Sequence, residues 1–475
     1  MQRLSSQDAA FLHLEDAVSH MHIGVVGILE GPPPSYQTLA DRVQAHLPRI
    51  PRYRQKVHFV PLALGRPVWV DDPHFNLGYH LRRTGLPSPG GDEELRLLVG
   101  RVMSQQLDRH KPLWELWMIE GLSDNRWALL SRSHHSMVDG VAAAELLSVL
   151  LDDEREPAVV PAEPWEPERQ PSGAELAVRA LGQRAMSPLD GLRPAGSPRA
   201  TARRVGDAAE GLLTLSGILQ PPRRSSLNGP LGPHRCWNWA RSRLSEVKMI
   251  RAALGGTVND VVLAAIAGGF RELLAARGEP TDRVVRSLVP VSVRSGGEQG
   301  QYNNRVSAIF ADLPVGIADP VERLASVTEQ MEHLKQSHEA VAGDVLVGLS
   351  GFAPAGLLAL ALRTATRVPQ RNVNTVTTNV PGPQRPLYAA GRRLLECFPY
   401  VPLAGHVRVG IAIFSYDGAL SFGVTGDYDA APDIGILCQG IERSMAELAA
   451  AARARTSAPP PDVVEGLAPL HAEEE

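Results

Sequence analysis

"RWALLSRSHHSMVDGVAAAELLSVLLDD", residues 126–153, joins a strand, a turn and a helix in one stretch. Its first ten residues include an apolar run over residues 127–130 and predict a strand that ends at two histidines, His134 and His135. Its last fourteen residues carry leucines and a valine at helical spacing and predict a helix. Asp139 and Gly140 stand where the turn meets that helix. The stretch therefore predicts an α/β fold in which a strand-to-helix loop holds polar side chains rigidly.

From the residues alone, three hypotheses fit this turn. In the first, His135 is a general base, because histidine accepts a proton near neutral pH, and Asp139 supports its ring or the turn. In the second, the histidines bind a metal ion, which an extended backbone disfavours because adjacent side chains point to opposite faces. In the third, the turn has no chemistry, and Gly140 only lets the chain bend. The sequence lacks the G-x-S-x-G elbow that a serine hydrolase of the α/β class needs.

Strands and helices alternate in both halves of the chain. The first half has a β-branched run over residues 22–31, followed by prolines, and a helical stripe over residues 35–50. The most regular helix is predicted over residues 255–279, where Thr257 can cap the start and Asp260 stands three residues later. Further strands are predicted over residues 283–294, 374–380 and 408–428, the last containing an Asp-Gly pair typical of a hairpin turn.

Composition divides the chain into four parts. Residues 153–234 are rich in proline and charge without a clear period, so they predict a linker or crossover between domains. Residues 1–152 would then form an N-terminal domain and residues 235–457 a second one, with residues 458–475 as a flexible tail. Two domains are the expectation for a chain of 475 residues.

Composition also limits the class of protein. With 44% hydrophobic and 21% charged residues, the chain is typical of a soluble globular protein. A net charge of -4 gives no electrostatic case for nucleic acid as a partner. Three widely spaced cysteines predict neither a zinc site nor a disulfide framework and indicate a reducing cytoplasm. The polar N-terminus lacks the apolar core of a signal peptide, so secretion is not expected.

"VLVGLSGFAPAGLLALAL", residues 345–362, is an apolar run without charge. Its length lies at the lower limit of a membrane-spanning helix, roughly 17–25 residues. Gly348, Gly351 and Pro354 loosen or break a helix, so one or two buried helices are the first interpretation. An apolar surface for lipid and a true span are the alternatives.

The histidine turn is also part of a longer pattern. "HHSMVDG", residues 134–140, matches the His-His-x-x-x-Asp-Gly signature of the coenzyme-A-dependent acyltransferase superfamily. Within it, the chain resembles the bacterial wax ester synthase/diacylglycerol acyltransferase family. The supporting pieces, in chain order, are "LSSQDAAFLHLE", "MHIG", "KPLWELWMIEGL", "LNGPLGPHR", "TVNDVVLAAIAGGFRELL", "LVPVSVR", "TTNVPGP" and "YDGALSFGVTGD". One departure is "YNNRVS", residues 302–307, where the family often carries a Gly-Asn pair.

The resemblance implies two chloramphenicol-acetyltransferase-like domains with mixed sheets on either side of a central channel. His135 would lie in that channel, with acyl-CoA entering from one face and the acceptor alcohol from the other. His135 would remove the hydroxyl proton as the oxygen attacks the thioester carbonyl, and would then protonate the departing CoA thiolate. No acyl-enzyme is implied, and no cofactor or metal, because acyl-CoA is itself the co-substrate.

The resemblance also implies roles for residues around the base. Asp139 would be mainly structural and pair with Arg294, which is otherwise a solvated strand end. His134 and Gly140 would shape the turn, and a direct catalytic role is the alternative for His134.

Two further sites carry alternatives. Asn259 and Asp260 resemble a motif needed for full activity, although Asp260 could equally cap its helix. Asn379 could donate a hydrogen bond to the oxyanion, or only satisfy the turn before Pro381. Trp114, in the "PLWE" piece, is expected in the core.

The implied activity is transfer of a long-chain acyl group from acyl-CoA to diacylglycerol, giving triacylglycerol and CoA. A long-chain fatty alcohol is the alternative acceptor, which would make the chain a wax ester synthase. Two further alternatives are a specialised-metabolite acyltransferase with a carrier-bound donor and a non-catalytic lipid-binding protein. The expected location is the cytoplasm, with peripheral attachment to the inner membrane or to lipid droplets.

Overall fold

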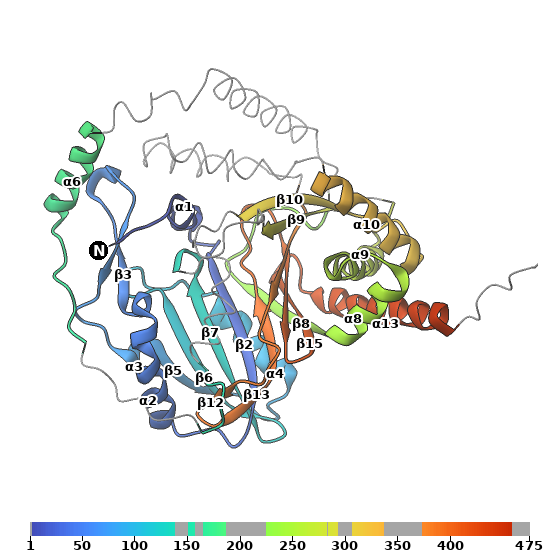
Figure 1. Ribbon diagram of the computed structural model, residues 1–475, viewed down its shortest axis with the longest axis horizontal. Coiled ribbons are helices and arrows are strands. Elements are labelled where there is room, and N and C mark those ends of the chain that lie inside the picture. Colours follow the sequence, from blue (N-terminus) through green and yellow to red (C-terminus); the bar gives the residue numbers. More distant parts are fainter. Residues whose placement is uncertain are drawn as a thin grey trace, which may run out of the picture.

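The computed structural model describes residues 2–137, 151–156, 165–186, 225–282, 284–292, 306–336 and 373–457. Two six-stranded sheets form the two halves of the molecule, and a three-stranded sheet lies at the edge of the first half (Figure 1). Both large sheets mix parallel and antiparallel pairs, and helices pack on them. The predicted mixed α/β class is therefore confirmed.

The first sheet positions the histidine turn. Its order is β12 (Tyr388–Ala389), β13 (Arg392–Tyr400), β2 (His22–Glu30), β7 (Arg126–His134), β6 (Trp114–Leu122) and β5 (Leu81–Gly85). Side chains alternate along β2, so Val25 and Leu29 pack under α2 (Tyr36–His46), while Val26 and Ile28 pack under α4 (Asp92–Met103). The neighbouring strand β7 lies at the centre of the same sheet and is also buried on both faces.

Two strands of the first sheet come from the far end of the chain. β13 pairs antiparallel with β2 over Gly24–Leu29, and β12 pairs with β13. The predicted boundary near residue 234 therefore does not separate the two sheets, because residues 388–400 belong to the first one. The periodicity of a strand does not tell which edge it joins.

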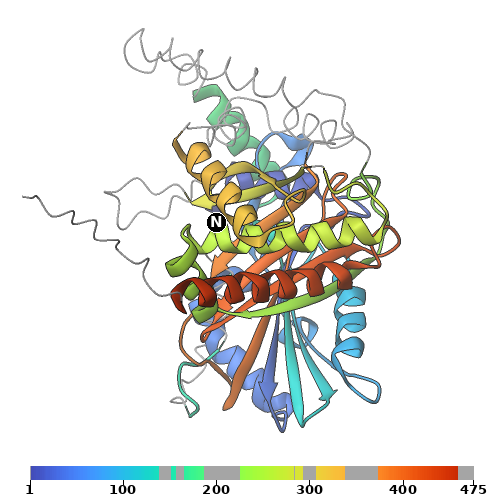
Figure 2. The ribbon, with the colours of Figure 1, turned by 90° about the vertical axis from the view of Figure 1, so that its right-hand side faces the viewer.

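The second sheet has helices packed in layers on one face. Its order is β10 (Val306–Leu313), β9 (Val285–Ser292), β11 (Thr375–Pro381), β14 (Val409–Tyr416), β15 (Ala419–Asp427) and β8 (Arg235–Arg243). The helices are α8 (Leu244–Leu254), α9 (Val258–Ala276), α10 (Pro320–Gln336) and α13 (Ile434–Ser457). Figure 2 shows α9 and α13 side by side. The two helices approach so closely at Gly269 that a Cβ on this residue would lie 2.9 Å from the carbonyl oxygen of Leu437.

Local signals in this half are confirmed. Thr257 caps α9, and its backbone N–H donates to the Asp260 carboxylate over 2.8 Å, which completes a capping box. The predicted hairpin also forms, with Asp417 and Gly418 at φ 44° and 81° between β14 and β15.

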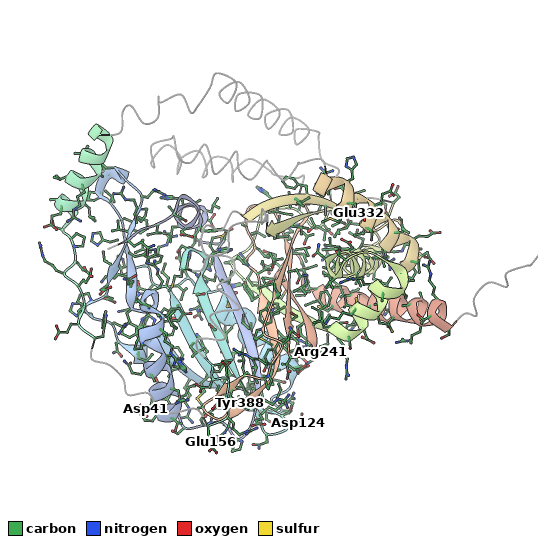
Figure 3. The ribbon with its side chains drawn as sticks, viewed as in Figure 1. Asp41, Asp124, Glu156, Arg241, Glu332 and Tyr388 are labelled. Carbon is green, nitrogen blue, oxygen red and sulfur yellow. The ribbon has the colours of Figure 1, made fainter. Side chains whose placement is uncertain are left out.

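Aromatic packing joins the two halves. Trp237 and Trp239 of β8 lie in one core cluster with Phe398 of β13 and residues of α4. Arg241 continues the contact at the surface, because its guanidinium binds Glu396 over 2.6 Å and lies 3.7 Å from Asp92. Figure 3 shows Arg241 at the lower boundary between the halves.

Part of the predicted linker packs on the first half. Helix α6 (Gly173–Met186) lies against the turn η3 (Pro61–Ala63) and the small sheet formed by β1 (Gln2–Arg3), β4 (Val68–Asp71) and β3 (Gln55–His58).

Other predicted elements lie outside the described residues: the helix after the histidine turn as far as residue 150, the apolar run over residues 345–362, and the tail. Among the described helices, none is by itself long and apolar enough to cross a membrane; one bent pair, α8 with α9, meets the length and composition criteria, and α9 is largely buried.

Candidate active site

The two histidines are held where β7 ends. His134 is the last residue of the strand and pairs with His22 of β2. The backbone N–H of His134 donates to the Leu113 carbonyl over 2.9 Å, and that of His135 donates to the Met21 carbonyl over 2.8 Å. The turn η4 (His135–Met137) follows directly. Strands on both sides therefore fix the backbone that carries the two rings.

His134 is fully buried and both ring nitrogens have partners. The backbone N–H of Ser136 lies 3.1 Å from Nδ1, so Nδ1 is the accepting, unprotonated nitrogen. The Ser136 hydroxyl is also 2.7 Å from Nδ1. The proton then sits on Nε2, which donates to the carboxylate of Glu15 over 2.9 Å. This arrangement agrees with the implied role of His134 as a residue that shapes the turn.

Glu15 is the C-cap of helix α1 (Ser6–Leu14), and its carboxylate is buried among donors. Arg109 donates to it over 2.8 Å and Gln106 over 3.0 Å. Burial by itself raises the pKa of Glu15, but the hydrogen bond from His134 and the charge and hydrogen bond of Arg109 outweigh it and lower the pKa to about 2. A permanent negative charge therefore lies beneath the histidine turn.

His135 has a different environment. Its ring stacks on Phe11 of α1, with centroids 3.8 Å apart and planes 21° apart. Its Nδ1 is buried and has no hydrogen-bond partner on another residue within the described part of the chain. Burial lowers the pKa of His135 to about 4, an effect that a contact with its own backbone opposes in part. His135 is therefore neutral at physiological pH and can accept a proton.

The structure does not place the residues predicted to follow the two histidines. Asp139, Gly140 and Arg294 lie outside the described residues, so the Asp139–Arg294 pair stays a prediction. The Asn303 region of "YNNRVS" lies outside them as well.

The supporting residues of the second half are placed on separate elements. Asp260 is buried at the start of α9 and acts as the cap, and Asn259 is half-buried beside it. Asn379 is half-buried near the end of β11, where β11 runs parallel to β14. The backbone just after it packs closely on β14, since a Cβ on Gly382 would lie 2.3 Å from the Ser415 carbonyl oxygen. Catalytic roles for these residues stay predictions.

Trp114 is confirmed as a core residue. Its indole is buried, stacks on His80 at 4.6 Å and donates to the Tyr53 carbonyl over 2.8 Å.

Sequence reasoning missed Glu15 and Phe11 as parts of the site. Both lie in "LSSQDAAFLHLE", which served only to support the resemblance, and their spacing of four residues places them one helical turn apart. Glu15 lies 119 residues from His134 along the chain, so no local pattern joins them. Across the described ranges, no group of three or more His, Cys, Asp or Glu side chains is arranged to hold a metal ion.

Comparison with known proteins supports, over most of the chain, the family resemblance seen in the sequence. Residues 4–262 match the model of the wax ester synthase/diacylglycerol acyltransferase catalytic domain, and residues 302–449 match that of the family's C-terminal domain. A Mycobacterium tuberculosis protein named "Probable diacyglycerol O-acyltransferase tgs1" is 38% identical over 96% of this chain and 97% of its own length.

Solved structures share the fold. A wax ester synthase/diacylglycerol acyltransferase from Marinobacter aquaeolei is 26% identical, with a TM-score of 0.67 over 95% of this chain and all of that one. The TRI3 trichothecene 15-O-acetyltransferase of Fusarium sporotrichioides is 14% identical with a TM-score of 0.61 over 94% of both chains. The first condensation domain of the CDA synthetase is similar at the same level, with 17% identity and a TM-score of 0.57, which shows the fold alone.

Proposed function

Because the chain belongs to the wax ester synthase/diacylglycerol acyltransferase family, we propose that it transfers a long-chain acyl group from acyl-CoA to the hydroxyl of diacylglycerol. The observation that carries the proposal is the state of His135. A neutral imidazole stands at the end of a rigid strand, with a neighbour whose own nitrogens are both engaged. Only one of the two histidines of the motif is thus free to take up a proton.

The proposed reaction uses the neutral imidazole of His135 as a base. The unprotonated nitrogen of His135 takes the proton of the acceptor hydroxyl while the oxygen forms a bond to the thioester carbonyl carbon. The tetrahedral intermediate then breaks its carbon–sulfur bond, and the imidazolium returns the proton to the CoA thiolate. The products are triacylglycerol and CoA, and the enzyme is regenerated. General base catalysis of this kind contributes about 10²–10⁴-fold to the rate.

We favour diacylglycerol over a fatty alcohol as the acceptor because of the names of the relatives. The 38%-identical protein carries only diacylglycerol O-acyltransferase in its name, whereas the structure that is 26% identical carries both wax ester synthase and diacylglycerol acyltransferase. A fatty alcohol is therefore the second candidate acceptor.

The test measures CoA release by thiol titration with palmitoyl-CoA and either diolein or hexadecanol, and separates the lipid products. The wild type should form triacylglycerol, and His135→Ala should lose about 10²–10⁴-fold of the rate. His46→Ala is the matched control, since His46 is a buried histidine paired with Asp152 and not with the motif. Binding of acyl-CoA without turnover on either acceptor would overturn the proposal in favour of a lipid-binding protein. Turnover only with an acyl carrier protein would favour the carrier-dependent alternative.

We also propose where the protein acts in the cell: in peripheral contact with the lipid surface that holds the acceptor. Helix α6 and turn η3 present apolar side chains to solvent, with Leu62 90%, Val178 69% and Leu181 51% exposed. The acyl chains at a lipid surface would accept these apolar side chains.

Flotation with vesicles that contain anionic lipid and diolein tests the patch. The double variant Leu62→Ser, Val178→Ser should lose most of the vesicle-bound fraction. Leu97→Ser is the control, because Leu97 is also well exposed, at 61%, but lies on α4. Wild-type flotation of the double variant would exclude this surface and leave residues 345–362 as the remaining candidate.

A further inference from the structure

We propose that Glu15 is a positioning residue of the acyl transfer, which holds the turn of His135 through the ring of His134. This inference rests on the proposed function, because it concerns the base of that reaction. The sequence suggested Asp139 as the carboxylate that supports the motif, whereas the described structure brings a different carboxylate to it from helix α1.

The first step is the charge of Glu15. Its side chain is 1% exposed and accepts hydrogen bonds from His134, Arg109 and Gln106. Since the pKa of Glu15 is held near 2, the carboxylate is ionised wherever the protein is folded and active. A buried charge with three donors costs much to displace, so it is a rigid anchor.

The second step is the ring of His134. The carboxylate accepts only from a protonated Nε2, and the Ser136 backbone N–H requires an unprotonated Nδ1. Glu15 therefore selects one tautomer and fixes the ring plane. The opposite tautomer would lose both contacts.

The third step links the fixed ring of His134 to the position of His135. Ser136 is the middle residue of η4, and His135 is the first, so a ring that holds Ser136 also holds the backbone of His135. The same helix supplies Phe11, which stacks on the His135 ring. Helix α1 thus contacts both histidines, through Phe11 on one and Glu15 on the other.

The chain contains a matched control for this arrangement. Asp152 is a second buried carboxylate bound by a histidine and an arginine, with His46 at 3.2 Å and Arg42 at 2.9 Å. It pairs with Tyr388 through an isolated bridge, near the lower edge of the molecule in Figure 3, whereas α1 lies at the upper side in Figure 1. Asp152→Asn therefore removes the same chemistry away from the motif.

The test compares Glu15→Gln with Asp152→Asn in the full chain, with thermal unfolding recorded for each. Glu15→Gln should lower kcat at least tenfold while the KM for palmitoyl-CoA and for diolein stays within about twofold, since the base is misplaced and substrate contacts remain. Asp152→Asn should leave kcat within about twofold at a temperature where both variants are folded. Wild-type kcat in Glu15→Gln, or equal loss in both variants, would overturn the inference.

Two additions keep the outcome decisive. If Glu15→Gln does not fold, Glu15→Asp keeps the charge but shortens the reach, and an unchanged kcat there would overturn the inference. If the wild type does not turn over either acceptor, the proposed function fails by itself. The inference is then decided by the carbethoxylation rate of His135 with diethyl pyrocarbonate, mapped by mass spectrometry. That rate should change several-fold in Glu15→Gln and stay constant in Asp152→Asn; no change in Glu15→Gln would overturn it.

Discussion

The end of β7 and the layer of α9 and α13 achieve rigidity in opposite ways. Around His134, the buried ring and the buried carboxylate of Glu15 are hydrogen-bonded to each other and to Ser136, Gln106 and Arg109. Between α9 and α13, glycines allow apolar side chains and backbones to approach within contact distance. The first region is stabilised by pairing charges, which depends on pH; the second is stabilised by packing, which depends on volume. The difference indicates that each region should fail under a different kind of change.

The largest effect should be the pH dependence of the stability that Glu15 contributes. The pKa of Glu15 is lowered from 4.5 to about 2 in the folded state, so its contribution to stability is complete above about pH 4.5 and is lost as the pH falls towards 2. Glu15→Gln should lower the free energy of unfolding by on the order of 3 kcal/mol at pH 7 and by much less near pH 2–3. Urea unfolding of both proteins across this range measures it. A gap that does not shrink in acid would contradict the charge-paired description of this region.

A smaller effect, independent of pH, is expected in the helical layer. A Cβ on Gly269 would lie 2.8 Å from Ile441 and 2.9 Å from the Leu437 carbonyl oxygen, so Gly269→Ala should cost about 1–3 kcal/mol. Gly182→Ala is the control, because a Cβ there meets nothing within 4 Å and alanine favours the helix by up to about 1 kcal/mol. Equal unfolding free energies for the two variants would show that the helices do not need this close approach.

The smallest effect sharpens the comparison at His135 itself. With its pKa near 4, His135 should stay neutral, and kcat/KM should hold its plateau, down to about pH 5. Phe11→Leu admits water to the ring, so the acid limb of the profile should move up by about one pH unit, since burial is what lowers this pKa. Phe75→Leu, which disturbs the stack on His80, should leave the limb in place. An unmoved limb in Phe11→Leu would mean that other groups bury the ring.

Local patterns predicted much of this fold and part of the site. The strand that ends at His134, the capped start of α9 and the Asp417-Gly418 hairpin depend on neighbouring residues, and all three are confirmed. The contact of Glu15 with His134 and the pairing of β13 with β2 depend on chain segments far apart, about which periodicity says nothing. The pair of Asp139 and Arg294 that the family resemblance implies lies outside the described residues, so it stays a prediction.

The position of β13 has a consequence for synthesis on the ribosome. β2 is complete at residue 30, but the strand that covers its outer edge begins at residue 392. At roughly 5–20 residues per second, that edge waits about 20–70 s for its partner, with unpaired backbone groups that invite pairing with other chains. The first half therefore cannot complete its sheet until late in translation. A fragment that stops after residue 152 would present an open edge, and a nascent chain stalled before residue 392 would be a natural substrate for chaperones.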